Sequence, residues 1–170
     1  WQKYLNELCV KNRITGISFR EKTNGWARYS FRLCSSAPKD GDLLQPSSEN
    51  AFMRGFLSHL SLRPSCHACP SKNGKSESDI SIADFWGIEK YNSKFADNKG
   101  TSAVLVYTDK GQDLLNKVSV LKEEHPLEQF EREVTTFFRS VEAHPKRSVF
   151  FERLDKAPLK ELVEEYVPKK

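Results

Sequence analysis

Apolar residues recur at helical spacing in three stretches of the chain. These stretches are Trp1–Val10, Glu49–Leu62 and Leu127–Val141, and each pattern predicts a helix with one apolar face. Cys9 falls on the first apolar face, so we expect it in the core rather than at a site. Ser48 precedes the second stretch and is a residue type that caps helices. Two shorter helices are expected near the end of the chain.

Alternating and continuous apolar runs predict four strands. Ile14–Arg20 and Trp26–Leu33 flank an Asn-Gly pair, the strongest short signal for a hairpin. Asp79–Ala83 alternates, and Ser102–Tyr107 contains a continuous apolar run that favours a central strand covered on both faces. The fold class is therefore α/β (α+β), with a mixed sheet flanked by helices and a helical C-terminal section.

The spacing of these elements predicts one domain over residues 1–170. Residues 1–120 would form the sheet-containing core and residues 121–170 the helical packing section, with the apolar faces of 52–60 and 127–141 in one core. Residues 35–48 are rich in Ser, Asp, Gly and Pro and predict an exposed loop, and 119–122 predicts a short strand. The chain begins at Trp1, so we expect it to be a piece of a longer protein.

Composition narrows the class of protein. The charged fraction of 29% is typical of a globular protein, and no apolar run is long enough to span a membrane. The net charge of +4 comes from basic residues interspersed with acids, which argues against a nucleic-acid-binding face. The four cysteines are unevenly spaced, which favours reduced thiols in the cytoplasm over a disulfide framework.

Cys66 and Cys69 lie between Pro64 and Pro70, in a sequence that predicts a held turn. Their spacing lets both thiols face one point at the edge of the sheet, which suits a metal ion or an iron–sulfur cluster. Two other interpretations are ordinary thiols or a redox pair, and a zinc site. The residues that could complete a zinc site are Cys34, His59, His67 and Cys9.

The next strand carries a carboxylate at each end and is followed by an aromatic pair. Asp79 and Asp84 could orient a turn or a cofactor, or they could hydrogen-bond nearby backbone amides as short acidic side chains often do. Trp86 could pack in the core or stack beside a flavin.

Several motifs, in order, resemble the C-terminal domain of the coenzyme F420 hydrogenase/dehydrogenase beta-subunit family. They cover roughly the first two thirds of the chain. The motifs are Phe19-Arg20-Glu21-Lys22 with Gly25-Trp26, Arg63-Pro64-Ser65-Cys66-x-x-Cys69, Ser78 through Gly87 with its Asp-Phe-Trp-Gly ending, Lys99-Gly100-Thr101-Ser102, and Thr108-x-Lys110-Gly111.

The resemblance implies a flavin- and iron–sulfur-dependent oxidoreductase that moves electrons between a hydride carrier, a flavin and clusters. It implies that Cys66 and Cys69 are half of a 4Fe–4S ligand set, with Cys34 as a candidate third ligand. It implies that Asp79, Asp84, Trp86 and Gly100 are near a cofactor such as FAD. The Asp-Phe-Trp-Gly form is similar to bacterial relatives associated with surface-polysaccharide synthesis.

Full-length relatives carry an N-terminal ferredoxin-like cysteine cluster and a middle region that this sequence lacks. The resemblance therefore implies that any flavin or cluster is shared with the N-terminal part of the same protein, and that the fragment is inactive alone. Its further partner would be a redox protein or a small electron carrier. The alternative is a zinc-stabilised or metal-free interaction module that docks a partner enzyme.

Overall fold

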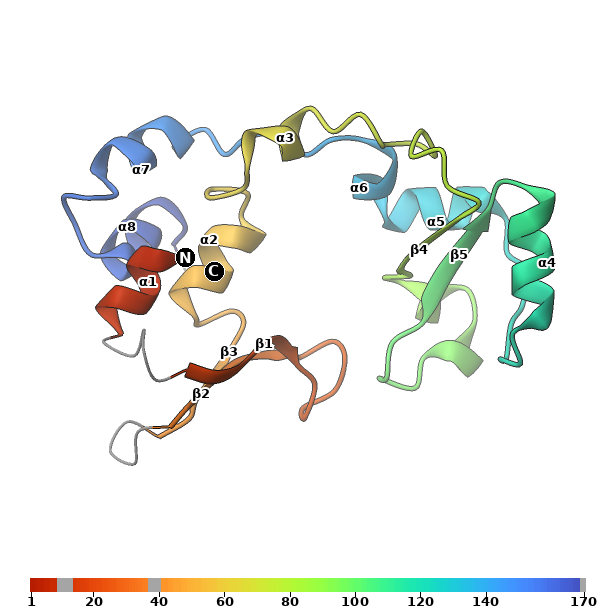
Figure 1. Cartoon of the computed structure of the whole chain (residues 1–170), viewed down its shortest axis with the longest axis horizontal. Coiled ribbons are helices and arrows are strands. Elements are labelled where there is room, and N and C mark those ends of the chain that lie inside the picture. Colours follow the sequence, from red (N-terminus) through yellow and green to blue (C-terminus); the bar gives the residue numbers. More distant parts are fainter. Residues whose placement is uncertain (9–13, 37–40, 169–170) are drawn as a thin grey trace. The chain divides into compact units, whose positions relative to one another are not determined.

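The chain folds into two compact units, which the computed structural model describes over residues 1–8, 14–36 and 41–168. Unit 1 comprises Trp1–Arg63 and Glu142–Lys170, and unit 2 comprises Pro64–Val141. Unit 1 therefore contains the first and last elements of the chain, and unit 2 is the continuous stretch between them (Figure 1). The expectation for Cys9 lies outside the described residues.

Unit 1 is built on an antiparallel sheet in the order β1-β2-β3. The strands are β1 (Ile14–Glu21), β2 (Ser30–Ser35) and β3 (Leu43–Pro46). The turn between β1 and β2 closes where the amide of Gly25 donates to the carbonyl of Lys22 at 2.8 Å. Gly25 has φ +91°, a conformation that glycine adopts without strain. The predicted hairpin is confirmed, although its second strand begins at Ser30 rather than at Trp26.

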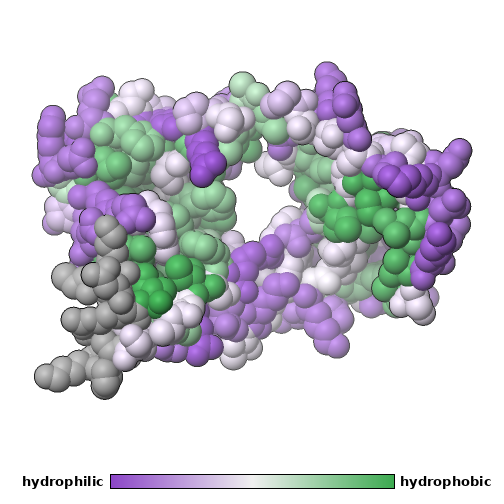
Figure 2. All heavy atoms as spheres, in the orientation of Figure 1, coloured by the Kyte–Doolittle hydropathy of each residue, from purple (hydrophilic) through white to green (hydrophobic). Residues whose placement is uncertain are grey.

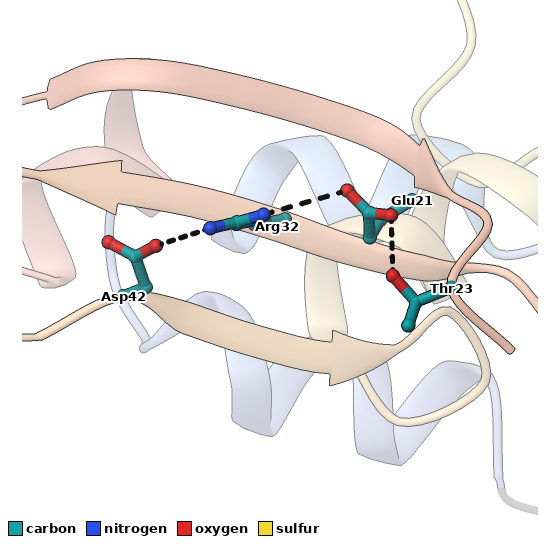
Figure 3. A network of polar contacts seen from close by, with 4 residues as sticks. All are labelled: Glu21, Thr23, Arg32 and Asp42. Atoms are coloured by element: carbon teal, nitrogen blue, oxygen red, sulfur yellow. Dashed lines mark hydrogen bonds and ion pairs between the residues drawn. The ribbon is translucent and has the colours of Figure 1, made fainter.

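Charged side chains link β2 to β1 and to Asp42, the residue that precedes β3. Arg32 on β2 lies between Asp42 and Glu21, with nitrogen–oxygen distances of 2.9 and 3.9 Å (Figure 3). Thr23 Oγ1 donates to Glu21 Oε1 at 2.8 Å. Because Arg32 is exposed and its partners lie on both neighbouring sides, this network is on the solvent side of the sheet.

Four helices pack against the other side of the sheet (Figure 1). They are α1 (Gln2–Glu7), α2 (Ala51–Leu57), α7 (Arg147–Arg153) and α8 (Leu159–Tyr166). Their apolar side chains enclose Phe31 and Leu33 of β2, which are 0% and 1% exposed. The fully buried residues Leu60, Leu162 and Val163 belong to the same cluster, so both ends of the chain contribute to one core.

A single buried amide ties α1, β3 and α2 together. Asn50 is 0% exposed, and its Nδ2 donates to Tyr4 Oη at 2.6 Å and to Gln45 Oε1 at 2.9 Å. Its Oδ1 accepts from the amide of Met53 at 3.1 Å, which makes Asn50 the N-cap of α2. The prediction that Ser48 caps this helix is wrong.

Unit 2 contains a two-stranded antiparallel sheet and short helices. The strands are β4 (Ile80–Asp84) and β5 (Ser102–Val106). The helices are α3 (Pro64–His67), the 3-10 turns η1 (Ile88–Lys90) and η2 (Ser93–Phe95), α4 (Asp109–Lys117), α5 (Leu127–Glu133) and α6 (Thr135–Phe138). In the part of the chain that the structure describes, no helix is long and apolar enough to cross a membrane.

The two faces of the β4–β5 sheet differ in what covers them. Ala83 and Ala103 pair across the strands and pack on a cluster that contains Phe85 and Phe130. Ile82 and Val104 pair on the opposite face and are 65% and 38% exposed. Figure 2 shows hydrophobic residues over this sheet and hydrophilic residues over α4.

The mixed α/β class is confirmed, but the arrangement of its strands differs from the prediction. The four predicted strands do not form one mixed sheet, because the described strands lie in two separate antiparallel sheets. The central position predicted for Ser102–Tyr107 is wrong, since β5 belongs to a two-stranded sheet with one exposed face. Residues 43–46 form β3 where a loop was predicted, and residues 119–122 are irregular where a strand was predicted.

The two long apolar stretches also do not share a core. Phe52 and Leu60 belong to the cluster of unit 1, whereas Phe130 and Val134 belong to the cluster of unit 2. The predicted helix over Leu127–Val141 is divided into α5 and α6 at Val134, whose φ and ψ of −123° and 57° are not helical.

Candidate functional site

The two cysteines of the Cys-x-x-Cys motif lie at one helical turn of unit 2. Cys66 is in α3, and Cys69 follows two residues after the helix ends. Both are half-buried free thiols. The amide of Cys69 donates to Ser140 Oγ at 3.0 Å, which fixes this end of the turn to the segment after α6.

The side chain of His67 is a second anchor of the same turn. Its Nδ1 lies 2.9 Å from the carbonyl oxygen of Val141. A carbonyl only accepts hydrogen bonds, so Nδ1 carries the proton and Nε2 is left as an acceptor in the neutral ring. Nε2 is buried, and no residue that the structure describes bonds to it. The turn that carries the thiols is thus anchored twice to residues 140–141.

The ligand set around these thiols is partial. Within residues 1–8, 14–36 and 41–168, no group of three or more His, Cys, Asp or Glu side chains is placed to hold a metal ion. Thiolates are the ligands that iron–sulfur clusters use, and such clusters usually take four. Cys66 and Cys69 fit that chemistry but do not complete it. His67 Nδ1 is turned to Val141, and His59 and Cys34 belong to unit 1, so the predicted zinc ligand set stays a prediction.

Cys34 belongs to unit 1, whereas Cys66 and Cys69 belong to unit 2. It lies in β2 opposite Gly16, and a methyl group at Gly16 would lie 3.7 Å from the sulfur. Its neighbour Asp42 has a pKa below the usual value, because it accepts hydrogen bonds from the Arg32 guanidinium and then from the Cys34 thiol. The structure therefore gives Cys34 a polar, charged neighbourhood on the sheet. Its predicted role as a ligand stays a prediction.

Asp79 bonds to side chains at the start of α4. Thr108 Oγ1 donates to Asp79 Oδ1 at 2.7 Å and accepts from the amide of Gly111 at 3.1 Å. Lys110 Nζ lies 2.7 Å from Asp79 Oδ2. The Lys110 contact first, and the Thr108 hydrogen bond second, lower the pKa of Asp79. Asp79 therefore joins β4 to the capped end of α4, which accounts for the Thr-x-Lys-Gly motif.

The two strand-end carboxylates lie too far apart to share one small site. Asp84 is at the opposite end of β4 from Asp79. Five residues of extended chain span about 17 Å. Asp84 instead leads into the aromatic pair, in which Phe85 is 5% exposed and Trp86 is 37% exposed. Phe85 thus fills the core position, while Trp86 keeps a partly exposed ring.

The Trp86 loop is joined to the loop that contains Gly100. The amide of Phe85 donates to the carbonyl of Thr101 at 2.9 Å, one residue beyond the ladder between β4 and β5. Gly100 has φ +98°, so the loop turns through a conformation that favours glycine. Of the predicted cofactor residues, Asp84, Trp86 and Gly100 therefore lie at one end of the sheet, and Asp79 lies at the other.

Residues 5–129 match the family model for the C terminus of the beta subunit of coenzyme F420 hydrogenase/dehydrogenase. The chain belongs to this family. The matched range contains every motif on which the resemblance was based, including Cys66, Cys69 and the segment from Asp79 to Gly111. Membership relates the chain to part of a redox enzyme. Comparison with curated proteins and with solved structures gave no match.

The sequence did not reveal one polar cluster of this beta-subunit domain. This cluster holds the loop that contains Trp86. Glu133 accepts from Lys90 Nζ at 2.6 Å and from Tyr91 Oη at 3.1 Å. The Lys90 hydrogen bond is the largest cause of a lowered pKa at Glu133. Gly87 has φ +80°, and a methyl group there would lie 2.5 Å from Glu133 Oε2.

Little in the sequence pointed to Glu133. It is one of several acidic residues on α5, and it lies beyond the range that matches the family. The glycine after Phe85-Trp86 was the available signal, because glycine marks positions with positive φ or close approach.

Proposed function

We propose that this beta-subunit domain is the electron-transfer part of a flavin- and iron–sulfur-dependent oxidoreductase. The observation that carries the proposal is the pair of free, half-buried thiols at Cys66 and Cys69, held at one turn within the range that matches the family. Soft, anionic thiolates suit iron. A bound 4Fe–4S cluster would supply a one-electron carrier.

The remaining ligands are proposed to come from Cys34 or from another part of the subunit. The anchors of the turn support this, because hydrogen bonds to Ser140 and Val141 hold the thiols without using their sulfur atoms. We propose that FAD, shared with that other part, lies against the partly exposed Trp86 ring and the Gly100 loop, and that Asp84 orients the loop. Asp79 is proposed to position α4 rather than to contact the flavin.

The wider role is proposed from the family relation. Electrons would pass to a redox partner protein or a small carrier in the cytoplasm, in support of surface-polysaccharide synthesis. Because the ligand set of the described residues is partial, we expect the isolated chain to have no redox activity.

The test is anaerobic reconstitution with iron, sulfide and FAD, carried out on this chain and on the longer subunit in parallel. We expect the longer subunit to contain about four more iron atoms per molecule than its double variant Cys66→Ser/Cys69→Ser. The double variant should lose this share of the iron and of the brown colour, and the neighbouring control Ser65→Ala should keep both. A stable stoichiometric cluster and flavin in the isolated chain would show that the site is not shared. Full iron content in the double variant would refute the ligand assignment.

A second candidate is a zinc-stabilised or metal-free interaction module that docks a partner enzyme. It is favoured by the exposed apolar pair Ile82 and Val104 on the β4–β5 sheet, since exposed apolar surface often marks contact sites. Colour separates the two candidates. A zinc or metal-free module stays colourless after anaerobic purification, whereas an iron–sulfur protein is brown.

A further inference from the structure

Unit 1 contains an open hollow that the redox proposal does not use. It lies between the segment after the β1–β2 turn and the end of β3, and its volume is about 680 Å³. Sites for small organic molecules commonly fall between about 300 and 1,000 Å³. The amide of Ser47 donates to the carbonyl of Tyr29 at 3.2 Å, which holds the two sides of the hollow together.

The charge of the hollow is positive and is not neutralised from within. Arg28 lines it, and no acidic side chain is among its lining residues in the part of the chain that the structure describes. No carboxylate in the described ranges forms an ion pair with Arg28, whereas Arg32 on β2 binds both Glu21 and Asp42. This arrangement favours an anionic ligand.

The other lining groups favour a ligand that also carries hydroxyls. Three serines (Ser30, Ser47 and Ser48) and Asn24 line the same hollow as Arg28. Hydroxyls and amides can both donate and accept, which matches sugar hydroxyls. A phosphate offers three acceptor oxygens to an arginine and neighbouring hydroxyls, one more than a carboxylate. Tyr29 supplies an aromatic side chain to the same wall.

We propose that this hollow binds a sugar phosphate, with the phosphate on Arg28 and the sugar hydroxyls on Ser47 and Ser48. The site lies wholly within unit 1 and is independent of Cys66 and Cys69. Because exposed charges are screened by salt, binding should weaken as ionic strength rises.

The test uses glucose 6-phosphate, inorganic phosphate and glucose as separate probes of the ¹⁵N-labelled chain. With glucose 6-phosphate, we expect amide shifts in residues 24–30 and in Ser47 and Ser48. Inorganic phosphate should shift the amides near Arg28 with at least tenfold weaker affinity, and glucose should cause no shift. No shift with glucose 6-phosphate, or shifts confined to other residues, would overturn the proposal. Equal affinity for inorganic phosphate and glucose 6-phosphate would overturn the sugar assignment.

Variants test the two halves of the site separately. Arg28→Gln should weaken glucose 6-phosphate binding at least about tenfold, because one charge-assisted contact is lost. Ser47→Ala should weaken glucose 6-phosphate binding but leave inorganic phosphate binding unchanged. The control Lys160→Gln makes the same change of charge on the exposed side of α8 and should bind like the parent. Unchanged binding in Arg28→Gln would rule out the site, and the folded state of each variant is checked by its amide spectrum.

Discussion

The contact between Gly111 and Asp79 shows how one missing methyl group lets two elements meet. A methyl group at Gly111 would lie 2.3 Å from the backbone oxygen of Asp79 and 2.9 Å from Ile80 Cγ2. Backbone atoms at the end of β4 cannot move as a flexible side chain would. The close approach allows Thr108, the cap of α4, to reach the Asp79 carboxylate.

Gly111→Ala tests this contact, because the same substitution in an ordinary helix raises stability, whereas here we expect it to lower stability. An alanine inside a helix normally stabilises by about 0.5–1 kcal/mol relative to glycine. Here we expect destabilisation of about 1–3 kcal/mol, because the new methyl group overlaps backbone. The measurement is the free energy of unfolding from urea titration, followed in the unit that carries the substitution. Gly16→Ala, in unit 1, is the control, since its methyl group would meet only ordinary contacts at 3.7 Å. A stabilised Gly111→Ala would contradict the contact.

The lowered pKa of Asp79 predicts a loss of stability in acid. A carboxyl group whose pKa is lower in the folded state stabilises the fold above its unfolded pKa, about 3.9, and this contribution is lost as the pH falls through the folded pKa. Asp79→Asn should therefore be less stable than the parent at pH 7, and the difference should shrink below about pH 4. Urea titrations at several pH values measure this difference in the free energy of unfolding. The control is Asp113→Asn on α4, the helix that Asp79 contacts. It should change the free energy of unfolding less than Asp79→Asn does at every pH.

At the scale of elements, α2 shows where sequence patterns suffice and where they do not. The apolar spacing correctly predicted a helix within 49–62, with Phe52, Phe56, Leu57 and Leu60 on its apolar face. Leu60 is buried as expected, but Phe56 and Leu57 are both 47% exposed, and Met53 is buried although it was not assigned to that face. The sequence indicated a polar residue at the N-cap of this helix, but it did not favour Asn50 over Ser48. The choice of Asn50 depends on Gln45, at the end of β3, and on Tyr4, which is 46 residues away in sequence and contacts Asn50 only in the fold.

Asn50→Ala should destabilise unit 1 by roughly 2–3 kcal/mol, because it removes a helix cap and leaves buried partners without their hydrogen bonds. Ser48→Ala is the matched control, and we expect a change of less than about 0.5 kcal/mol, as for an ordinary exposed site. Thermal or urea unfolding of both variants gives the comparison. If Ser48→Ala lowers the free energy of unfolding more than Asn50→Ala does, the N-cap of α2 has been assigned to the wrong residue.

Strand pairing was the least predictable part of the fold. The hydrophobic run of β5 suggested coverage on both faces, because such runs are typical of central strands. In unit 2 only one face is covered by the Phe85–Phe130 cluster, and Val104 remains 38% exposed. The apolar pattern along a strand indicates which of its faces can be buried, but it does not indicate which elements cover them.

At the scale of the whole molecule, the residues that the structure describes form two hydrophobic clusters with no shared members. One contains Phe31 and Leu162, and the other contains Phe85 and Phe130. Composition indicated enough apolar residues for a core but could not show that they divide into two. The predicted site residues follow the same division. The motif residues of unit 2 were predictable from local sequence, whereas the placement of Cys34 in unit 1 depends on the fold.

Separate clusters predict separate responses to core substitutions. Leu162→Ala should destabilise unit 1 by about 2–5 kcal/mol, because it leaves a cavity at a fully buried position. Amide hydrogen exchange should then accelerate in α2, α8 and β2 but not in β4 or α5. Phe130→Ala should give the reverse pattern. Uniform acceleration across both units in either variant would show that the two cores unfold together.

The interleaved order of the two units also has a consequence for synthesis. Unit 2 is one continuous stretch, Pro64–Val141, so all of it emerges from the ribosome before Glu142–Lys170 does. Unit 1 must wait longer, because Leu162 and Val163, which are 0% exposed in its core, are translated after the whole of unit 2. Domains generally fold as units during translation. The nascent chain can therefore complete unit 2 first, and the strands β1–β3 stay without their covering helix α8 until Leu159–Tyr166 has emerged.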